Sequence, residues 1–354
     1  MPFRETLSLA AGSGNRVSGM SHLRHKLCIH GLAVEIACHV PQIRLQINHL
    51  AGPFSVSDVP EGFATCGEIR PYVENEVVRH LSASAARMPL DDPWLEVYQD
   101  GERFWLVDER WGIAEINFLR GQWRSWVLER ARAHPIQQVE GAVLWPMAQL
   151  LRTRGLHLVP AVAVARDGFG ALVLSSFGIG RELERVIRGG YRIIGQRWTA
   201  MRSDGSRIEL LHVPGAVELS EPPRLRRPDA MAGGQWADLS RRFPGCVQLH
   251  AFCDVVIVAE PGRRSDPQIY ELTIPEAQDL LRQSWPLIDI HPTRKGGQFP
   301  TQLGRNCRCV QVQFSKDSGD LLLLLEALRA AAPIRPRLSV SMMKGKTAGA
   351  NSAA

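Results

Sequence analysis

The clearest hydrophobic pattern in the chain is an uninterrupted aliphatic run at residues 158–165. A turn at residues 166–168 separates it from a second apolar run, residues 171–174. Short apolar runs that are rich in β-branched residues and bounded by turn residues are typical of buried strands. Residues 182–188 follow with helical character, and Gly189-Gly190 supplies the glycine stop that commonly ends a helix. This segment is therefore predicted to fold as strand, turn, strand, loop and helix.

The pattern over residues 26–135 indicates mostly strands joined by turns. Residues 95–99 and 103–108 flank the turn Asp100-Gly101-Glu102 and predict a hairpin, because an Asp-Gly pair readily adopts the positive φ values of a tight turn.

Two helices have recognisable local signals. Apolar residues at helical spacing predict a helix over residues 137–154, which Pro146 should kink or break. Thr273 followed by Pro275 and Glu276 is a capping signature and predicts that a helix begins there. Further strands are predicted near residues 207–213, 255–259 and 307–314, loops over 214–245 (partly mobile) and 289–306, and a last helix over 318–331.

The organisation that follows is an α/β protein of two domains. Residues 21–135 are predicted to form a β-rich N-terminal domain, and residues 136–332 a C-terminal α/β domain. The two ends, residues 1–20 and 333–354, are rich in small and polar residues and are predicted to be disordered.

The loop between the second strand and the helix reads Ser-Ser-Phe-Gly-Ile-Gly-Arg-Glu. A phosphate-binding loop places Gly-x-x-x-x-Gly-Lys-Ser/Thr between a strand and a helix, so that backbone N–H groups hold the phosphates. Here Ser175 replaces the first glycine, Gly180 keeps the second, Arg181 replaces the lysine, and Glu182 replaces the hydroxyl residue that binds Mg²⁺. Gly178, Gly180 and Arg181 are therefore candidates for a vestigial phosphate loop. Glu182 places a carboxylate where such loops bind an anion.

Residues 159–201 resemble the C-terminal domain of HPr kinase/phosphorylase and the wider group of bacterial HPr-kinase-like proteins. The resemblance implies a P-loop domain of the HPr-kinase/PEP-carboxykinase type, ATP and Mg²⁺ as cofactors, and phosphorylation of a serine. At five positions the family pattern has a different residue from this chain. The family has a histidine where this chain has Pro160, a lysine at the position of Arg181, a Ser or Thr at the position of Glu182, and aspartates at the positions of Gly195 and Gln196. Each of these chemical positions departs from the family pattern.

These departures bear directly on phosphoryl transfer, which depends on positioning and on neutralising charge with Mg²⁺ and its carboxylate ligands. Arg181 still suits a phosphate, but the hydroxyl ligand and the acidic pair are missing. Three readings stay open: a homologue that lost catalysis, a strand–loop–helix unit that never bound nucleotide, and an active serine kinase with relocated metal ligands. The first expects no cofactor and the third expects ATP and Mg²⁺.

Cysteine and histidine residues offer a possible metal site, which we weigh against simple burial. Cys246, His250, Cys253 and the pair Cys307-x-Cys309 contain enough ligands for a tetrahedral set, but they lack the tight Cys-x₂₋₄-Cys spacing of zinc sites. The strand pattern around Cys307 and Cys309 places both on one face, so the thiols are predicted to be small buried hydrophobic groups.

Composition narrows the function classes. The 354 residues include 45% hydrophobic and 22% charged positions, as in ordinary globular proteins, and seven cysteines, an odd number that favours a reducing cytoplasm. The net charge of +6 is spread along the chain without a nucleic-acid-binding motif, so nucleic-acid binding is not expected. A membrane span and a targeting segment are not expected either.

The leading hypothesis is a catalytically silent homologue, a cytoplasmic pseudokinase that binds a protein or peptide or acts in regulation. Its partner is expected in a groove near Arg192, Arg197 and Trp198 and in the stretch that contains Trp236, because arginine and tryptophan commonly anchor interfaces. The basic side chains suit an acidic partner. The resemblance also leaves a homo-oligomer possible.

Overall fold

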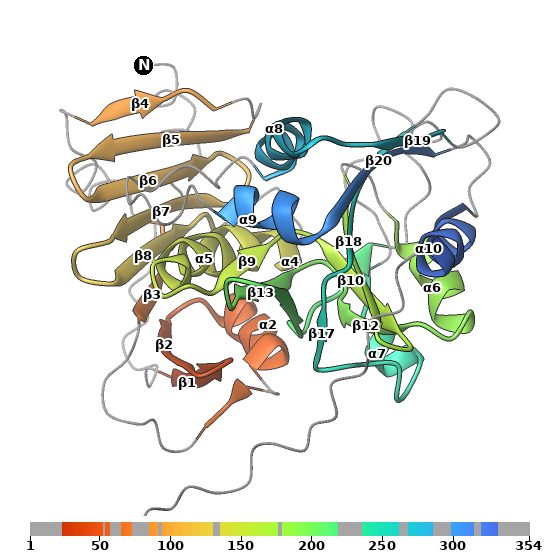
Figure 1. Cartoon of the computed structure of the whole chain (residues 1–354). Coiled ribbons are helices and arrows are strands. Elements are labelled where there is room, and N and C mark those ends of the chain that lie inside the picture. The colour runs from red at the N-terminus through yellow and green to blue at the C-terminus, as the bar shows by residue number, and fades with distance from the viewer. Residues whose placement is uncertain are drawn as a thin grey trace, which may run out of the picture.

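The computed structural model describes residues 23–51, 54–56, 65–72, 85–90, 94–129, 135–175, 179–218, 236–261, 268–285, 299–314 and 320–331. The ends predicted to be disordered, residues 1–20 and 333–354, lie outside these residues. The chain folds as a mixed α/β protein with several sheets (Figure 1).

The N-terminal part forms an eight-stranded sheet in the order β1-β2-β3-β8-β7-β6-β5-β4. Its strands are β1 (Leu23–Ile29), β2 (Leu32–Cys38), β3 (Thr65–Pro71), β4 (Ala86–Met88), β5 (Leu95–Asp100), β6 (Arg103–Asp108), β7 (Gly112–Asn117) and β8 (Gln122–Val127). Strand β3 runs parallel to both of its neighbours, whereas the other pairs are antiparallel. The predicted hairpin is confirmed as β5–β6, and Gly101 in its turn has φ +56°.

A helix interrupts the strands of this N-terminal part. Helix α2 (Pro41–Ala51) buries Ile43 and Ile47, which lie one helical turn apart.

The helix predicted over residues 137–154 is a helix with a π turn inside it. It consists of α4 (Pro135–Val139), the π-helix η2 (Glu140–Leu144) and α5 (Trp145–Arg152). The backbone N–H of Trp145 donates to the carbonyl of Glu140, and Pro146 lies in the first turn of α5, where no intrahelical N–H is needed. The helix is not broken at Pro146: it continues from α4 into α5, and the irregularity is the π turn that precedes the proline.

The C-terminal part is built on a six-stranded sheet in the order β12-β10-β11-β18-β20-β19. Its strands are β10 (Val162–Arg166), β11 (Phe169–Ser175), β12 (Arg192–Gly195), β18 (Val255–Pro261), β19 (Gln268–Glu271) and β20 (Arg308–Phe314). Strands β11, β18 and β20 are mutually parallel. The turn between β10 and β11 uses positive φ at Asp167 (+51°) and Gly168 (+85°).

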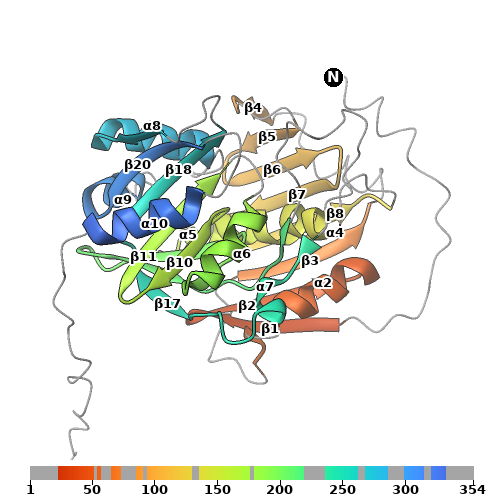
Figure 2. The ribbon, with the colours of Figure 1, turned by 90° about the vertical axis from the view of Figure 1, so that its right-hand side faces the viewer.

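Both faces of this sheet are covered, which explains why its strands read as continuous apolar runs. Val162 and Val164 belong to the core under helices α6 (Gly180–Arg188) and α10 (Asp320–Ala331). Ala163 and Ala165 face the opposite core, which includes residues of α8 (Ile274–Ser284) and α9 (Phe299–Asn306). Figures 1 and 2 show α6 and α10 together on one side of the sheet.

A smaller four-stranded sheet, in the order β17-β14-β13-β9, packs on the α8–α9 side. Its strands are β9 (His157–Val159), β13 (Thr199–Ser203), β14 (Ile208–Leu211) and β17 (His250–Phe252). The aliphatic run at 158–165 therefore serves two sheets, because the chain passes from β9 to β10 at Pro160. Strands β15 (Val217–Glu218) and β16 (Trp236–Ala237) pair with each other, and α7 (Leu239–Arg242) follows.

The prediction of a loop over residues 289–306 is wrong for residues 299–306, which form helix α9; residues 289–298 lie outside the described residues. Phe299 and Leu303 are one helical turn apart and both are buried, so their packing outweighs the helix-weakening Gly304. The capping signature at Thr273 is confirmed: its backbone N–H donates to a Glu276 carboxylate oxygen at 2.8 Å.

The division of the chain into two domains near residue 135 stays a prediction. The packing adds that residues from both sides of that position share one hydrophobic core. Trp198, Leu211 and Val213 belong to the same buried cluster as Ile36 and Ile43 of the N-terminal part.

Candidate functional site

The start of helix α6 is the candidate phosphate-loop position. Strand β11 ends at Ser175, and α6 begins at Gly180 with Ile179 as its N-cap residue. Ile179 offers no side-chain cap, and Gly180 is buried whereas Arg181 is exposed. Gly178 lies outside the described residues. The predicted order of strand, loop and helix is confirmed.

Glu182 occupies the first turn of α6 and is 8% exposed. Its Oε1 accepts a hydrogen bond from Nη1 of Arg185 at 2.8 Å. The N-terminal turn of a helix favours a negative charge, and here the protein's own carboxylate provides it. An incoming phosphate would therefore meet like charge at the end of the helix that normally attracts it.

The positions of the two implied aspartates have structural roles. A Cβ atom at Gly195 would lie 2.2 Å from Oγ1 of Thr199 and 2.4 Å from the carbonyl oxygen of Trp198, so no side chain fits there without a shift. Gln196 is buried and caps helix α7: its Oε1 accepts from the backbone N–H of Leu239 at 2.7 Å.

A carboxylate does lie beside Gln196. The side-chain amide of Gln196 donates to Oδ1 of Asp238 at 2.9 Å. Asp238 is itself the N-cap of α7 and accepts from the backbone N–H and the hydroxyl of Ser240, at 2.9 and 2.6 Å. Sequence reasoning missed this carboxylate because it is 42 residues away from Gln196.

Arg197 and Trp198 meet at a second buried carboxylate, Glu140 of the π-helix. Arg197 donates to both oxygens of Glu140, through Nε to Oε1 and through Nη2 to Oε2 at 2.7 Å. The indole Nε1–H of Trp198 also donates to Oε1, at 3.0 Å. Trp145 packs edge-to-face on Trp198, with ring centroids 5.2 Å apart.

This cluster borders a small pocket of about 30 Å³, which has room for one or two water molecules. Its walls are mostly apolar, and the loop after β14 closes one side. The lining residues include Ile136, Val139, Leu144, Pro214 and Ala216.

The expected groove residues are thus largely committed to the protein itself. Trp198 is 3% exposed, which corrects the expectation that it anchors a partner: its ring is part of the core and its N–H is already bonded. Arg197 is ion-paired with Glu140. Arg192 is exposed and donates from Nη1 to the carbonyl of Gly245 at 2.5 Å. Trp236 forms the short strand β16 opposite Glu218, and its side chain lies outside the description.

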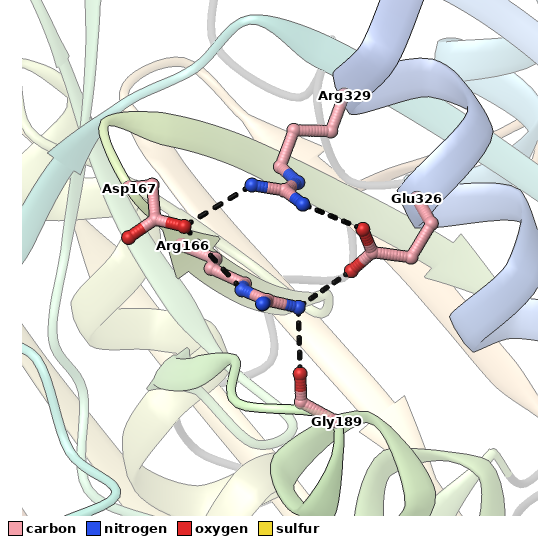
Figure 3. A network of polar contacts seen from close by, with 5 residues as sticks. All are labelled: Arg166, Asp167, Gly189, Glu326 and Arg329. Atoms are coloured by element: carbon pink, nitrogen blue, oxygen red, sulfur yellow. Dashed lines mark hydrogen bonds and ion pairs between the residues drawn. The ribbon is translucent and has the colours of Figure 1, made fainter.

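The C-terminal end of α6 is held by a polar network that joins three elements (Figure 3). Nη1 of Arg166 donates to the carbonyl of Gly189 at 2.7 Å and to Oε1 of Glu326 on α10 at 2.8 Å. Arg329 of α10 donates to Glu326 at 2.7 Å and to Asp167 at 3.1 Å. The hydrogen bond from Arg329 lowers the pKa of the Glu326 carboxyl. The network fixes the turn after β10, the end of α6 and helix α10 to one another.

The cysteines form no metal centre within the described ranges. Cys246, Cys253, Cys307 and Cys309 are buried free thiols, which confirms their predicted burial. A hydrogen bond with Cys307 and burial raise the pKa of Cys253, and burial raises that of Cys309 to about 12. In these parts of the chain, no three His, Cys, Asp or Glu side chains are grouped to hold a metal ion.

Comparison with known proteins gives a partial likeness to solved structures. No family model matches the chain, and no curated protein matches it. Among solved structures, the HPr(Ser) kinase/phosphatase from Coxiella burnetii matches with a TM-score of 0.32 and 12% sequence identity. The match covers 49% of this chain and 90% of that one. None of the described helices is long and apolar enough to cross a membrane.

Proposed function

We propose that the chain is a catalytically silent HPr-kinase-like homologue, a cytoplasmic module that binds a protein or peptide and does not transfer phosphate. The observation that carries this proposal is Glu182, a covered carboxylate in the first turn of α6. Two like charges 4 Å apart repel by roughly 4 kcal/mol at an effective dielectric constant of about 20, which corresponds to about a thousandfold loss of affinity. In addition, Gly195 and Gln196 occupy the two positions where the resemblance implies aspartates, so neither acidic group is present there.

The first prediction is that Mg·ATP binds weakly or not at all. Calorimetry on the wild-type chain should show no binding below about 1 mM, because the first turn of α6 carries its own carboxylate. The double variant Glu182→Ser with Arg181→Lys should raise the affinity at least about tenfold, or roughly 1.4 kcal/mol.

Glu184→Ser is the matched control, since it removes a carboxylate from the same helix, where Glu184 pairs with Arg242 instead. Micromolar, Mg-dependent ATP binding by the wild type would contradict the proposal. Equal gains in the double variant and the control would show that general charge, and not the position of Glu182, decides affinity.

A second candidate function is an ATP-dependent serine kinase with a relocated metal ligand, and Asp238 favours it. Its carboxylate lies beside Gln196, where the resemblance implies an aspartate. This function predicts transfer of labelled phosphate from Mg·ATP to a protein of the host extract, lost in both Asp238→Asn and Arg181→Ala. The silent homologue predicts no transfer by the wild type.

A further inference from the structure

Six exposed arginines gather on one side of the C-terminal part, over helices α6 and α7 and the start of β12. They are Arg181, Arg185, Arg188, Arg192, Arg241 and Arg242, here called the arginine face. The three on α6 follow one another at spacings of four and three residues, so they form a single outward stripe. Leu183 and Val186 on the opposite side of the same helix are buried.

Contacts between α6 and α7 hold this face together. The ring of Phe243 lies beneath the guanidinium groups of Arg188 and Arg242, 5.8 and 6.0 Å from their centres. Arg242 is also ion-paired with Glu184 of α6. Figure 2 shows α7 beside α6 on this side of the molecule.

The arginine face is positive towards solvent although it contains acidic residues. Glu182, Glu184 and Asp238 pair with Arg185, Arg242 and Arg241, and their side chains are only 11%, 16% and 13% exposed. The paired arginine side chains are 52%, 51% and 74% exposed. Among the described residues, six exposed guanidinium groups stand against three mostly covered carboxylates, so the arginine face is positive towards solvent.

We infer that the arginine face docks an acidic segment of another protein, with carboxylates spaced along successive helical turns. The inference rests on the proposed function and names its partner class. The stripe on α6 runs from Arg181 to Arg188, a rise of about 10 Å along the helix, and so matches carboxylates that follow one another at helical spacing. Arginine forks bind carboxylates bidentately, and complementary charge speeds and orients docking.

A protein partner fits this face better than a nucleic acid does. Leu249 is 69% exposed and follows Gln248, whose backbone N–H donates to Ile193, the residue next to Arg192. An exposed leucine at the edge of a basic surface suits an apolar side chain of a protein partner.

The test is fluorescence anisotropy with a labelled 16-residue helical peptide that carries glutamates at the same spacings of four and three residues. The triple variant Arg185→Gln, Arg188→Gln, Arg241→Gln should weaken binding at least about tenfold at 50 mM salt. The matched control is Arg202→Gln, Arg282→Gln, Arg308→Gln, which removes three other carboxylate-paired arginines from β13, α8 and β20 and should change binding less than about twofold.

Three outcomes overturn the inference: no binding of the peptide by the wild type, equal losses in the two triple variants, or tighter binding of a 16-nucleotide single strand that the first triple variant abolishes. A second measurement needs no variant. The peptide should protect Arg185 and Arg188 of the wild type from modification by p-hydroxyphenylglyoxal and leave Arg202 reactive, and unprotected Arg185 and Arg188 would also overturn it.

This test and the ATP titration fail independently. Tight Mg·ATP binding with the expected peptide results would reject the silent homologue and keep the docking surface. Absent ATP binding with no peptide binding would reject the docking surface alone.

Discussion

Single residues at the implied catalytic positions show why acidic groups are absent from them. Thr199 and the backbone of Trp198 lie so close to Gly195 that a Cβ atom would clash with them. Both the oxygen and the nitrogen of the Gln196 amide are hydrogen-bonded to residues at the start of α7. Close packing and hydrogen bonds therefore determine which residue types fit at these two positions.

Gly195 is therefore expected to resist even the smallest side chain. Gly195→Ala should lower the free energy of unfolding by about 1–3 kcal/mol, because the new methyl group overpacks against Thr199. Urea denaturation measures the loss. Gly215→Ala is the control, since a Cβ there meets nothing within 4 Å, and it should be close to neutral. Equal stability of the two variants would show that the chain around residue 195 relaxes freely.

A second residue-scale prediction concerns the buried ring of His157. The ring is stacked on Phe299, with centroids 3.7 Å apart, and burial, assisted by the charge of Arg152, lowers its pKa to about 3. The unfolded chain binds this proton near pH 6.5 and the folded chain does not, so stability is complete above pH 6.5 and falls as the pH drops toward 3.

Wild type should lose about 2 kcal/mol from this residue between pH 7 and pH 5, at roughly 1.4 kcal/mol per pH unit. His157→Phe keeps the stacking and removes the titration. Its denaturation midpoints should therefore show a smaller loss over the same interval. Parallel curves for the two proteins would mean that the ring gains a proton inside the fold.

At the scale of elements, the sequence predicted what is local. The continuous aliphatic runs gave the strands covered on both faces, and the Asp-Gly turn gave the hairpin. The cluster around Glu140 was out of reach, because its partner Arg197 is 57 residues away and a π turn sets the direction of the carboxylate. Helix α9 was missed for a related reason: it is stabilised by the burial of Phe299 and Leu303 against other parts of the chain, which local sequence does not reveal.

The capping box of α8 offers an element-scale test. Thr273→Ala removes the hydroxyl of the N-cap and should lower stability by about 1 kcal/mol. Thermal or urea unfolding measures it. Thr301→Ala is the comparison, because that hydroxyl lies on α9 and accepts from the side-chain amide of Gln278 at 3.0 Å. A larger loss at Thr301 would place the main support of α8 in its contact with α9.

At the scale of the whole molecule, the shared core couples the two halves of the chain. Besides the apolar cluster, Nε2 of His30 lies 2.8 Å from the carbonyl of His212, so a polar contact also links β-rich and α/β parts. Separating the halves would uncover part of this shared core, including Val213, which lies beside Ile29 and Ile36 of the N-terminal part. Exposing a buried aliphatic side chain costs about 1.5–3 kcal/mol.

A fragment of residues 136–354 is therefore expected to be poorly folded when it is produced alone. It should bind the dye ANS and lack a cooperative thermal transition by circular dichroism, whereas the full chain should show one. Co-expression with residues 1–135 should restore solubility. A monomeric fragment with a sharp transition of its own would show that the core divides cleanly near residue 135.

The π turn at Glu140–Leu144 has a consequence for how this arrangement arises in evolution. Such a turn holds one more residue than the α-helical turn it replaces, and one residue advances a helix by about 100°. Deleting a single residue there would produce a continuous α-helix and swing Glu140 by about a quarter of a revolution, away from Arg197 and Trp198. The contacts of Glu140 with Arg197 and Trp198 thus depend on the one extra residue of the π turn. A substitution of Glu140 or Arg197 would remove a side chain but would not change the direction of the helix face.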